Sequence, residues 1–255
     1  MIKKIFAPLL IKGCLSFTDL SIQLKNIGYD ATIEGIGKSP CASELHYIFE
    51  KIPKECFEEG LKMLDELSAK LYSKFGEDLD VFVTDGTAIS SVYLEERTIK
   101  LKKRLVKERH DYTFLIRIHT NTIRCVKEHT NKIMPYITMI PPNSTFLADP
   151  EFDVEENYRM ADFYGINLHI KQKKVRSKRC RKPFRREFRK KFDDEEYRKR
   201  KLGERCFGNI EIRGVKCYYK KRESKLKGAI LIACEHNIIQ YFKNKAWCNL
   251  FVKLR

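Results

Sequence analysis

The spacing of hydrophobic residues changes near residue 79. Before that point the chain predicts helices at 16–24, 43–49 and 53–72, and in the last of these apolar residues recur every three or four positions. Gly28 and the segment 35–40 separate the pieces. Short helices with Gly-rich turns are compatible with a helix-turn-helix, and equally with any small helical bundle. We therefore predict a small helical region, residues 1–78, in which DNA binding stays open.

After residue 79, short apolar runs alternate with helical patterns. Strands are predicted at 79–84, 112–119, 122–128, 145–148 and 166–170, with a hairpin turn at Thr120-Asn121. Helices are predicted at 154–164, 193–209 and 228–242. Asp153 stands at the N-cap position of the first of these, with Glu156 three residues on as in a capping box. The alternation predicts an α/β domain over residues 79–255.

Two of the predicted strands end in an aspartate, Asp85 and Asp149. The carboxyl ends of strands are where ligands gather in open α/β sheets, so neighbouring strands would bring these two carboxylates together. Two close carboxylates repel each other unless a proton or a cation lies between them. Carboxylate oxygens are the ligands that hard cations such as Mg²⁺ prefer. The pattern therefore indicates a metal site at this edge.

The predicted helix 193–209 offers a third acid. Tyr197, Arg200 and Glu204 are three and four positions apart, so they share one helix face. Glu204 would bind the ion, Arg200 would hold a phosphate oxygen, and Tyr197 would position a phosphate or stack on a base. The plainer interpretation is a solvated face with one Arg–Glu pair.

Charge is concentrated in the C-terminal part of the chain. The net charge is +17, and residues 151–255 hold 30 Lys and Arg against 14 Asp and Glu. This asymmetry indicates a polyanionic partner. The run 171–191 is the most basic, and we predict an exposed, poorly ordered clamp on the DNA backbone rather than a folded core element. Its central cations are Lys178, Arg179, Arg181 and Lys182; the alternative is a solvated linker.

Nine cysteines without a C-x-x-C spacing argue against a zinc site and suit a reducing cytoplasm. No segment approaches the roughly 20 apolar residues of a membrane span, so we expect a cytoplasmic protein without a membrane partner.

Three segments resemble the catalytic regions of insertion-sequence transposases with a DDE triad. They are the runs DVFVTDGTAI, FLADPEFDVEENYRMADFYGINLHIK and YRKRKLGERCFGNIEIR, in this order. The resemblance matches the triad onto Asp85, Asp149 and Glu204, with Tyr197 and Arg200 on the third motif. It implies a ribonuclease-H-like mixed sheet flanked by helices.

The resemblance further implies two Mg²⁺ ions, for which Mn²⁺ can substitute, held by the three acids. Expected partners are double-stranded DNA, as element ends and target, and a second copy of the chain in a homodimer at the prokaryotic nucleoid. The chemistry would be cleavage at the ends of a mobile element and joining of the 3′-hydroxyls to target DNA.

The sequence departs from the family pattern at two positions. Glu211 stands where a Lys is expected, and Arg213 is the nearby residue that can take its DNA-contacting role. Glu151 stands where Gly is usual. Residues 1–78 resemble the family only loosely, which fits a copy shortened at its start. Two alternatives stay open: a plain metal-dependent nuclease, and an inactive or domesticated DNA-binding relative.

Overall fold

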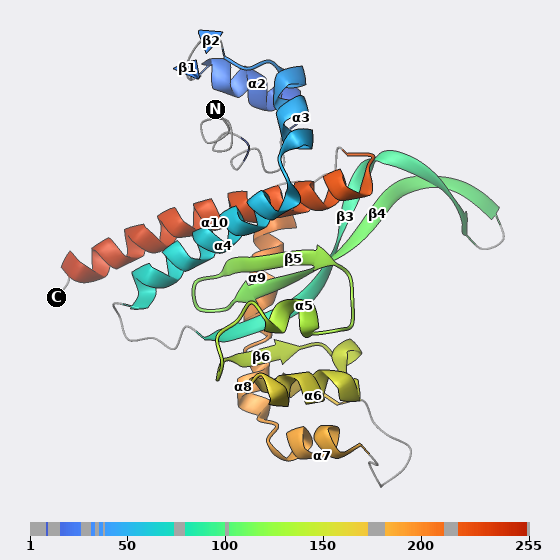
Figure 1. Cartoon of the computed structure of the whole chain (residues 1–255), viewed down its shortest axis with the longest axis vertical. Helices are drawn as coiled ribbons and strands as arrows, with labels where there is room; N and C mark the ends of the chain where they lie inside the picture. Colours follow the sequence, from blue (N-terminus) through green and yellow to red (C-terminus); the bar gives the residue numbers. More distant parts are fainter. Residues whose placement is uncertain are drawn as a thin grey trace.

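The computed structural model describes residues 9, 16–26, 32–33, 36–37, 39–73, 80–99, 102–172, 182–211 and 219–253. Its centre is a five-stranded sheet in the order β5-β4-β3-β6-β7 (Figure 1). The strands are β3 (Val81–Ile99), β4 (Lys102–Arg117), β5 (Thr122–Glu128), β6 (Thr145–Ala148) and β7 (Asn167–Ile170). β3, β4 and β5 pair antiparallel, whereas β6 and β7 run parallel to β3.

This order and these directions confirm the predicted ribonuclease-H-like α/β fold. Counted along the chain, the sheet runs third, second, first, fourth, fifth, with the last two strands parallel to the first. The parallel pairing of β3 with β6 brings the two strands that precede Asp85 and Asp149 side by side. The fold thereby places the two predicted acids at one edge.

Each face of the sheet carries its own apolar cluster, because successive side chains of a strand point to opposite faces. Val81 and Val83 join one cluster with α4 (Lys54–Tyr72), α9 (Lys201–Glu211) and α10 (Arg222–Lys253). Phe82 joins the other. That second cluster includes residues of α5 (Met134–Ile137), α6 (Glu155–Phe163) and α7 (Pro183–Lys190), and the 3₁₀ turn η2 (Pro150–Phe152).

The N-terminal part is helical, as predicted, apart from a two-stranded ribbon. It contains α2 (Phe17–Asn26), β1 (Thr32–Ile33), β2 (Ile36–Gly37) and α3 (Ala42–Lys51). The ring of Phe49 stacks on Tyr219 with centroids 4.7 Å apart, so α3 shares the apolar cluster of the sheet. α4 lies across β5 and beside α10 (Figure 1). The division of the chain at residue 78 stays a prediction.

The strand predicted to end at Asp85 continues well past it. β3 runs on to Ile99 because β4 forms a long hairpin with it, in which Asp85 pairs with Phe114 and Gly86 with Thr113. An Asp-Gly pair is a local signal for the end of a strand, yet backbone pairing with a neighbouring strand overrides that signal. Asp85 is therefore held inside a ladder instead of on a loop.

Asp153 does not cap the helix that follows it, contrary to the predicted capping box. The N-cap of α6 is Val154, without a side-chain bond, and the Asp153 carboxylate instead accepts from Arg185 and from the Tyr158 hydroxyl. A buried carboxylate gains more from a guanidinium and a phenol than from an exposed helix end. Asp153 thus joins α6 to α7.

The predicted helix 193–209 is two helices, α8 (Asp194–Arg198) and α9, with Lys199 and Arg200 between them. At this junction the N–H groups of Arg200 and Gly203 donate to carbonyls three residues back, at 3.1 and 2.9 Å. The chain turns tightly there, and Arg200 occupies the break.

Candidate active site

The structure brings all three predicted acids to one guanidinium. Arg200 Nη1 lies 2.8 Å from Asp149 Oδ1 and 3.8 Å from Asp85 Oδ2, and its Nη2 lies 4.0 Å from Glu204 Oε1. The side chains of Asp85, Asp149 and Arg200 are 19–27% exposed, whereas Glu204 is 60% exposed. The acids come from β3, from the end of β6 and from α9. Arg200, which lies between α8 and α9, therefore joins β3, β6 and α9.

Burial and the neighbouring Asp149 raise the pKa of Asp85 to about 6, against an ordinary value of 3.8. Arg200 and the backbone N–H of Gly86, which donates to Asp85 Oδ1 at 2.9 Å, act in the opposite direction. One positive charge does not compensate for the burial and for the second carboxylate. A pKa displaced in this way is typical of functional sites, and a proton or a further cation would relieve the repulsion.

A glycine lets α9 approach the sheet closely enough to carry Glu204 to this edge. A Cβ built at Gly203 would lie 2.6 Å from Cγ1 of Val83, two residues before Asp85. By contrast, a Cβ at Gly208 on the same helix would meet nothing within 4 Å. The close contact at Gly203 therefore fixes the position of α9 beside the acids. The sequence alone does not show that Gly203 lies against Val83.

Tyr197, near the end of α8, lies beside the acid cluster. Its ring centroid is 5.3 Å from that of Phe192, and Arg200 lies close enough to oppose the rise of its pKa. Burial raises its pKa. A neutral phenol next to the guanidinium can orient Arg200, and can donate to an anion that Arg200 binds.

The second half of the basic run 171–191 is a docked helix, so the prediction of an unfolded clamp is wrong for residues 183–190. Arg185 and Phe188 of α7 are buried, and the guanidinium of Arg185 meets both oxygens of Asp153 at 2.7 and 2.5 Å. Glu155 accepts from the backbone N–H groups of Phe184 and Arg185. These two acids attach the first turn of α7 to the domain, which the charge of the run alone did not predict.

The structure describes only some of the other residues that were predicted to contact DNA. Lys182 is exposed at the N-cap of α7, and Arg186, Arg189 and Lys190 of that helix are exposed as well. Lys178, Arg179, Arg181 and Arg213 lie outside the described residues. Their contact with DNA stays a prediction.

The structure adds three residues that sequence reasoning did not assign to the site. A cavity of about 250 Å³ next to Asp85 and Asp149 is also lined by Asp111, His129 and Glu151. His129 Nε2 lies 3.8 Å from a Glu151 oxygen. Glu151 is the residue that departs from the transposase pattern, so that departure was the available signal. Asp111 and His129 could not be assigned from the sequence, because their proximity depends on the register of the hairpin.

Within the described part of the chain, no three His, Cys, Asp or Glu side chains are arranged to hold a metal ion, and Arg200 lies among the three acids. The donor chemistry nevertheless fits Mg²⁺ or Mn²⁺, since all three groups are carboxylates. Burial and the carboxylate of Asp149 both raise the pKa of Asp85, and a bound cation would oppose both effects. A metal would have to replace the contacts of Arg200.

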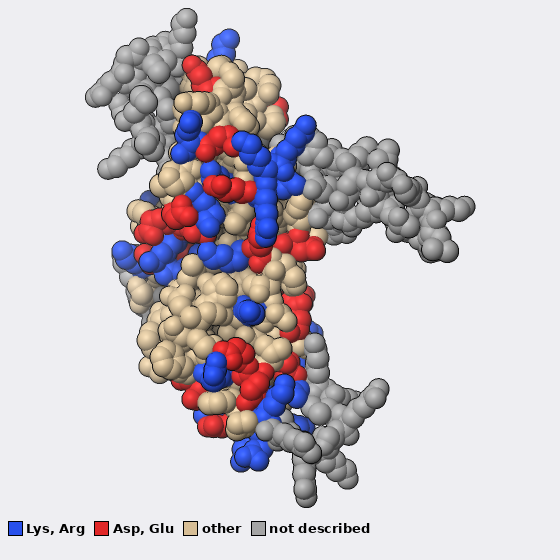
Figure 2. All heavy atoms as spheres, turned by 45° about the vertical axis from the view of Figure 1, so that its right-hand side comes forward, with Lys and Arg blue, Asp and Glu red and all other residues tan. Residues whose placement is uncertain are grey.

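The charged surface is mixed in sign. On the face shown in Figure 2, long Lys and Arg side chains reach outward among acidic ones in the upper half, and the middle is largely uncharged.

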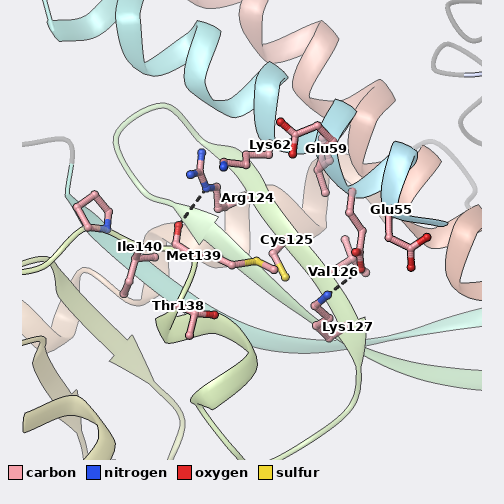
Figure 3. Close-up of a pocket in the computed structure, with 13 residues that line it drawn as sticks. Glu55, Glu59, Lys62, Arg124, Cys125, Val126, Lys127, Thr138, Met139 and Ile140 are labelled. Atoms are coloured by element: carbon pink, nitrogen blue, oxygen red, sulfur yellow. Dashed lines mark hydrogen bonds and ion pairs between the residues drawn. The ribbon is translucent and has the colours of Figure 1, made fainter. Parts of the chain in front are cut away.

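A separate cavity of about 490 Å³ lies between α4 and β5, lined by Arg124, Cys125 and Met139 among others (Figure 3). None of the three acids lines it.

Comparisons with known proteins add little to this geometry. No family model matches the chain, and no curated protein matches it in sequence. None of the described helices is long and apolar enough to cross a membrane. Among solved structures, the Mos1 transposase paired-end complex with left transposon end is similar at 13% identity and a TM-score of 0.25. That similarity covers 86% of this chain and 80% of the other. At so low a score, the fold assignment rests on strand order and direction alone.

Proposed function

We propose that this chain is a metal-dependent transposase that cuts DNA at the ends of a mobile element and joins the 3′-hydroxyls to target DNA. One observation carries the proposal: carboxylates from β3, from the end of β6 and from α9 lie within 4.0 Å of one guanidinium on a sheet of ribonuclease-H-like order. The order of the motifs along the sequence supports the same function.

Asp85, Asp149 and Glu204 would hold Mg²⁺ or Mn²⁺. When bound, two such ions activate the attacking hydroxyl and stabilise the leaving oxygen of a phosphodiester. Arg200 would then exchange the carboxylate of Asp149 for a phosphate oxygen, because a guanidinium binds both groups with similar geometry. Tyr197 would orient Arg200 and donate to the same phosphate.

The exposed cations of α7 would hold double-stranded DNA beside this edge through its phosphates. We propose a homodimer as the active complex, since two element ends must be held together. None of the six cysteines of the described residues forms a disulfide, and we propose that the protein acts at the prokaryotic nucleoid in a reducing cytoplasm.

The test is nicking of a supercoiled plasmid that carries the DNA flanking the coding sequence, with Mg²⁺ or Mn²⁺. Asp85→Asn and Glu204→Gln should each lower the rate roughly a hundredfold or more, since several kcal/mol of charge stabilisation are lost. Both variants should retain binding to the same DNA. Asp162→Asn, an exposed acid at the end of α6, is the matched control and should cleave normally.

The outcomes separate the competing functions. Joining of a labelled pre-cut end to the plasmid supports a transposase, whereas nicking without joining indicates a plain nuclease. DNA binding without nicking in either metal indicates an inactive or domesticated DNA-binding relative. Equal cleavage by Asp85→Asn and the unmodified protein would remove this carboxylate from the mechanism.

A further inference from the structure

Two cavities beside the acid cluster share a wall. The cavity of about 250 Å³ at Asp85 and Asp149 is lined at its far side by Asp111 and His129. The same two residues line a second cavity, of about 490 Å³, which extends to Arg222 and Lys225 at the start of α10. The backbone N–H of His129 donates to the carbonyl of Asp111 at 3.0 Å, which holds the shared wall in place. The two cavities are therefore adjacent, and together, here called the groove, they extend from Asp85 to Arg222.

The far end of this groove carries an oriented guanidinium. Arg222 is 85% exposed, and two of its nitrogens donate to the two oxygens of Glu128 at the end of β5. The pairing with Arg222 lowers the pKa of Glu128, which stays ionised. A guanidinium has five N–H donors, so two bonds to Glu128 leave donors for a second acceptor. Lys225 adds a second positive charge to the same wall.

The acids of the groove restrict where an anion can lie. Asp111 and Glu128 repel phosphates from their own positions, whereas the exposed Arg222 attracts them at the rim, with the buried charge of Lys225 behind it. A strand in the groove would therefore run its backbone along α10 and turn its bases toward the carboxylates, which accept hydrogen bonds from base amino groups.

We infer that this groove, named here the Arg222 groove, binds the backbone of a single DNA strand that continues from the phosphate at the acid cluster. The inference rests on the proposed function, because it takes the acid cluster as the place where the strand is cut. It adds the path of the unpaired strand, with its phosphates bound by Arg222, and it assigns Asp111 and His129 to the floor of that path.

The experiment measures affinity by fluorescence anisotropy in the Asp85→Asn background, so that cleavage does not intervene. The probes are a flush duplex and the same duplex with a single-stranded extension on its 5′ or its 3′ end. The tested variant is Arg222→Gln with Glu128→Gln, which removes the cation without leaving its partner unpaired. The matched control is Arg159→Gln with Glu156→Gln, an exposed pair on α6 whose atoms are 2.6 Å apart.

We expect one of the two extensions to increase affinity in the background protein. The Arg222 variant should bind that probe roughly three- to tenfold more weakly, with a salt slope shallower by about 0.7 to 0.9 for each phosphate that the protein no longer neutralises. Affinity for the flush duplex should not change, and the control variant should behave as the background protein does.

Two results overturn the inference. Equal affinity for flush and extended probes means that no strand lies in the groove, and an equally weakened affinity for both probes means that Arg222 contacts duplex DNA instead. Either result leaves plasmid nicking, and with it the proposed function, unaffected. Absence of binding to every probe would remove the proposed function and the groove together.

Discussion

Two clusters of carboxylates and guanidinium groups lie on this sheet, and they differ in composition and burial. At the acid cluster, one guanidinium faces three carboxylates, at distances that lengthen from 2.8 to 4.0 Å. In the other, the carboxylate of Asp65 on α4 is fully buried and faces Arg117 and Arg124. Arg117 also lies 3.4 Å from the partly exposed Asp80, and Arg124 lies 3.0 Å from the partly exposed Glu66. Arg117 and Arg124 donate to it at 3.1 to 3.2 Å, and the Thr122 hydroxyl at 2.6 Å.

The difference teaches which cluster holds the fold and which can bind a ligand. Both oxygens of Asp65 have two partners each, so this cluster has no capacity for another group. The acid cluster has too few donors for its carboxylates, and it opens to solvent at Glu204. A satisfied buried network makes a structure specific, whereas an unsatisfied exposed one can take up a cation.

The largest effect should come from Asp65→Asn. The amide leaves the two nearly buried guanidinium groups with only their partly exposed partners Asp80 and Glu66, and loss of a buried pair costs up to about 3–5 kcal/mol. Urea unfolding should show a lower midpoint without a change in the slope m. Asp194→Asn, at an exposed pair on α8, is the control and should change stability by less than about 1 kcal/mol. A small effect at Asp65 would mean that the network is no more structural than the acid cluster.

Asp85→Asn should remove a contribution to the pH dependence of stability. The sign of this contribution is opposite to that of a carboxylate in a stabilising salt bridge. The pKa of Asp85 rises from 3.8 to about 6 on folding, so the folded protein takes up a proton between these values. The stability this proton contributes is full below about pH 4 and is lost as the pH rises through 6. The unmodified protein should therefore lose on the order of 2–3 kcal/mol relative to the variant over this window.

Urea titrations at pH 4, 5, 6 and 7 measure this difference. Asp162→Asn should follow the unmodified protein at every pH. Parallel profiles for the unmodified protein and Asp85→Asn would show that the carboxyl of Asp85 titrates as it does in an unfolded chain, and that the acid cluster needs no further cation.

Gly203→Ala should separate the packing of α9 from the intrinsic preference of a helix for Ala. The new Cβ would lie 2.6 Å from Val83, and such overpacking costs about 1–3 kcal/mol. Gly208→Ala meets no atom within 4 Å, and it should stabilise the helix by up to about 1 kcal/mol. Thermal unfolding of both variants gives the comparison. Stabilisation by both would mean that α9 can move away from β3 without cost.

The sequence predicted the elements that depend on local pattern and missed those that depend on partners. β5 and β6 have the predicted bounds, because alternation and a turn define them locally. The proximity of the three acids could be predicted because two aspartates follow strand patterns and a motif supplies the third acid. By contrast, the length of β3 depends on its pairing with β4, and the folding of α7 depends on Asp153 and Glu155. Neither partner is visible from the segment itself.

The same limit explains the parts of the site that were missed. Asp111 and His129 meet at the edge of the hairpin through the register of β4 and β5, and single-strand patterns do not give a register. The contact of Gly203 with Val83 joins segments 120 positions apart in the chain. From the shared helix face of Tyr197, Arg200 and Glu204, the sequence predicts that Arg200 holds a phosphate oxygen. Its place among the acids follows from the break between α8 and α9.

The smallest effect, and the sharpest comparison of the two clusters, is expected from Arg200→Gln. If the guanidinium occupies the place of a cation, removing it should strengthen binding of Mn²⁺, since a unit charge about 4 Å away acts with about 1 kcal/mol in a solvated site. That corresponds to roughly fivefold tighter binding, measured by titration of the free Mn²⁺ electron paramagnetic resonance signal without DNA. Arg117→Gln at the buried cluster is the contrast. It should lower stability and leave Mn²⁺ binding unchanged, because Asp65 is closed to solvent. Equal Mn²⁺ affinity in Arg200→Gln and the unmodified protein would show that the guanidinium and the metal do not compete, and Arg200 would then be a structural bridge like the pair at Asp65.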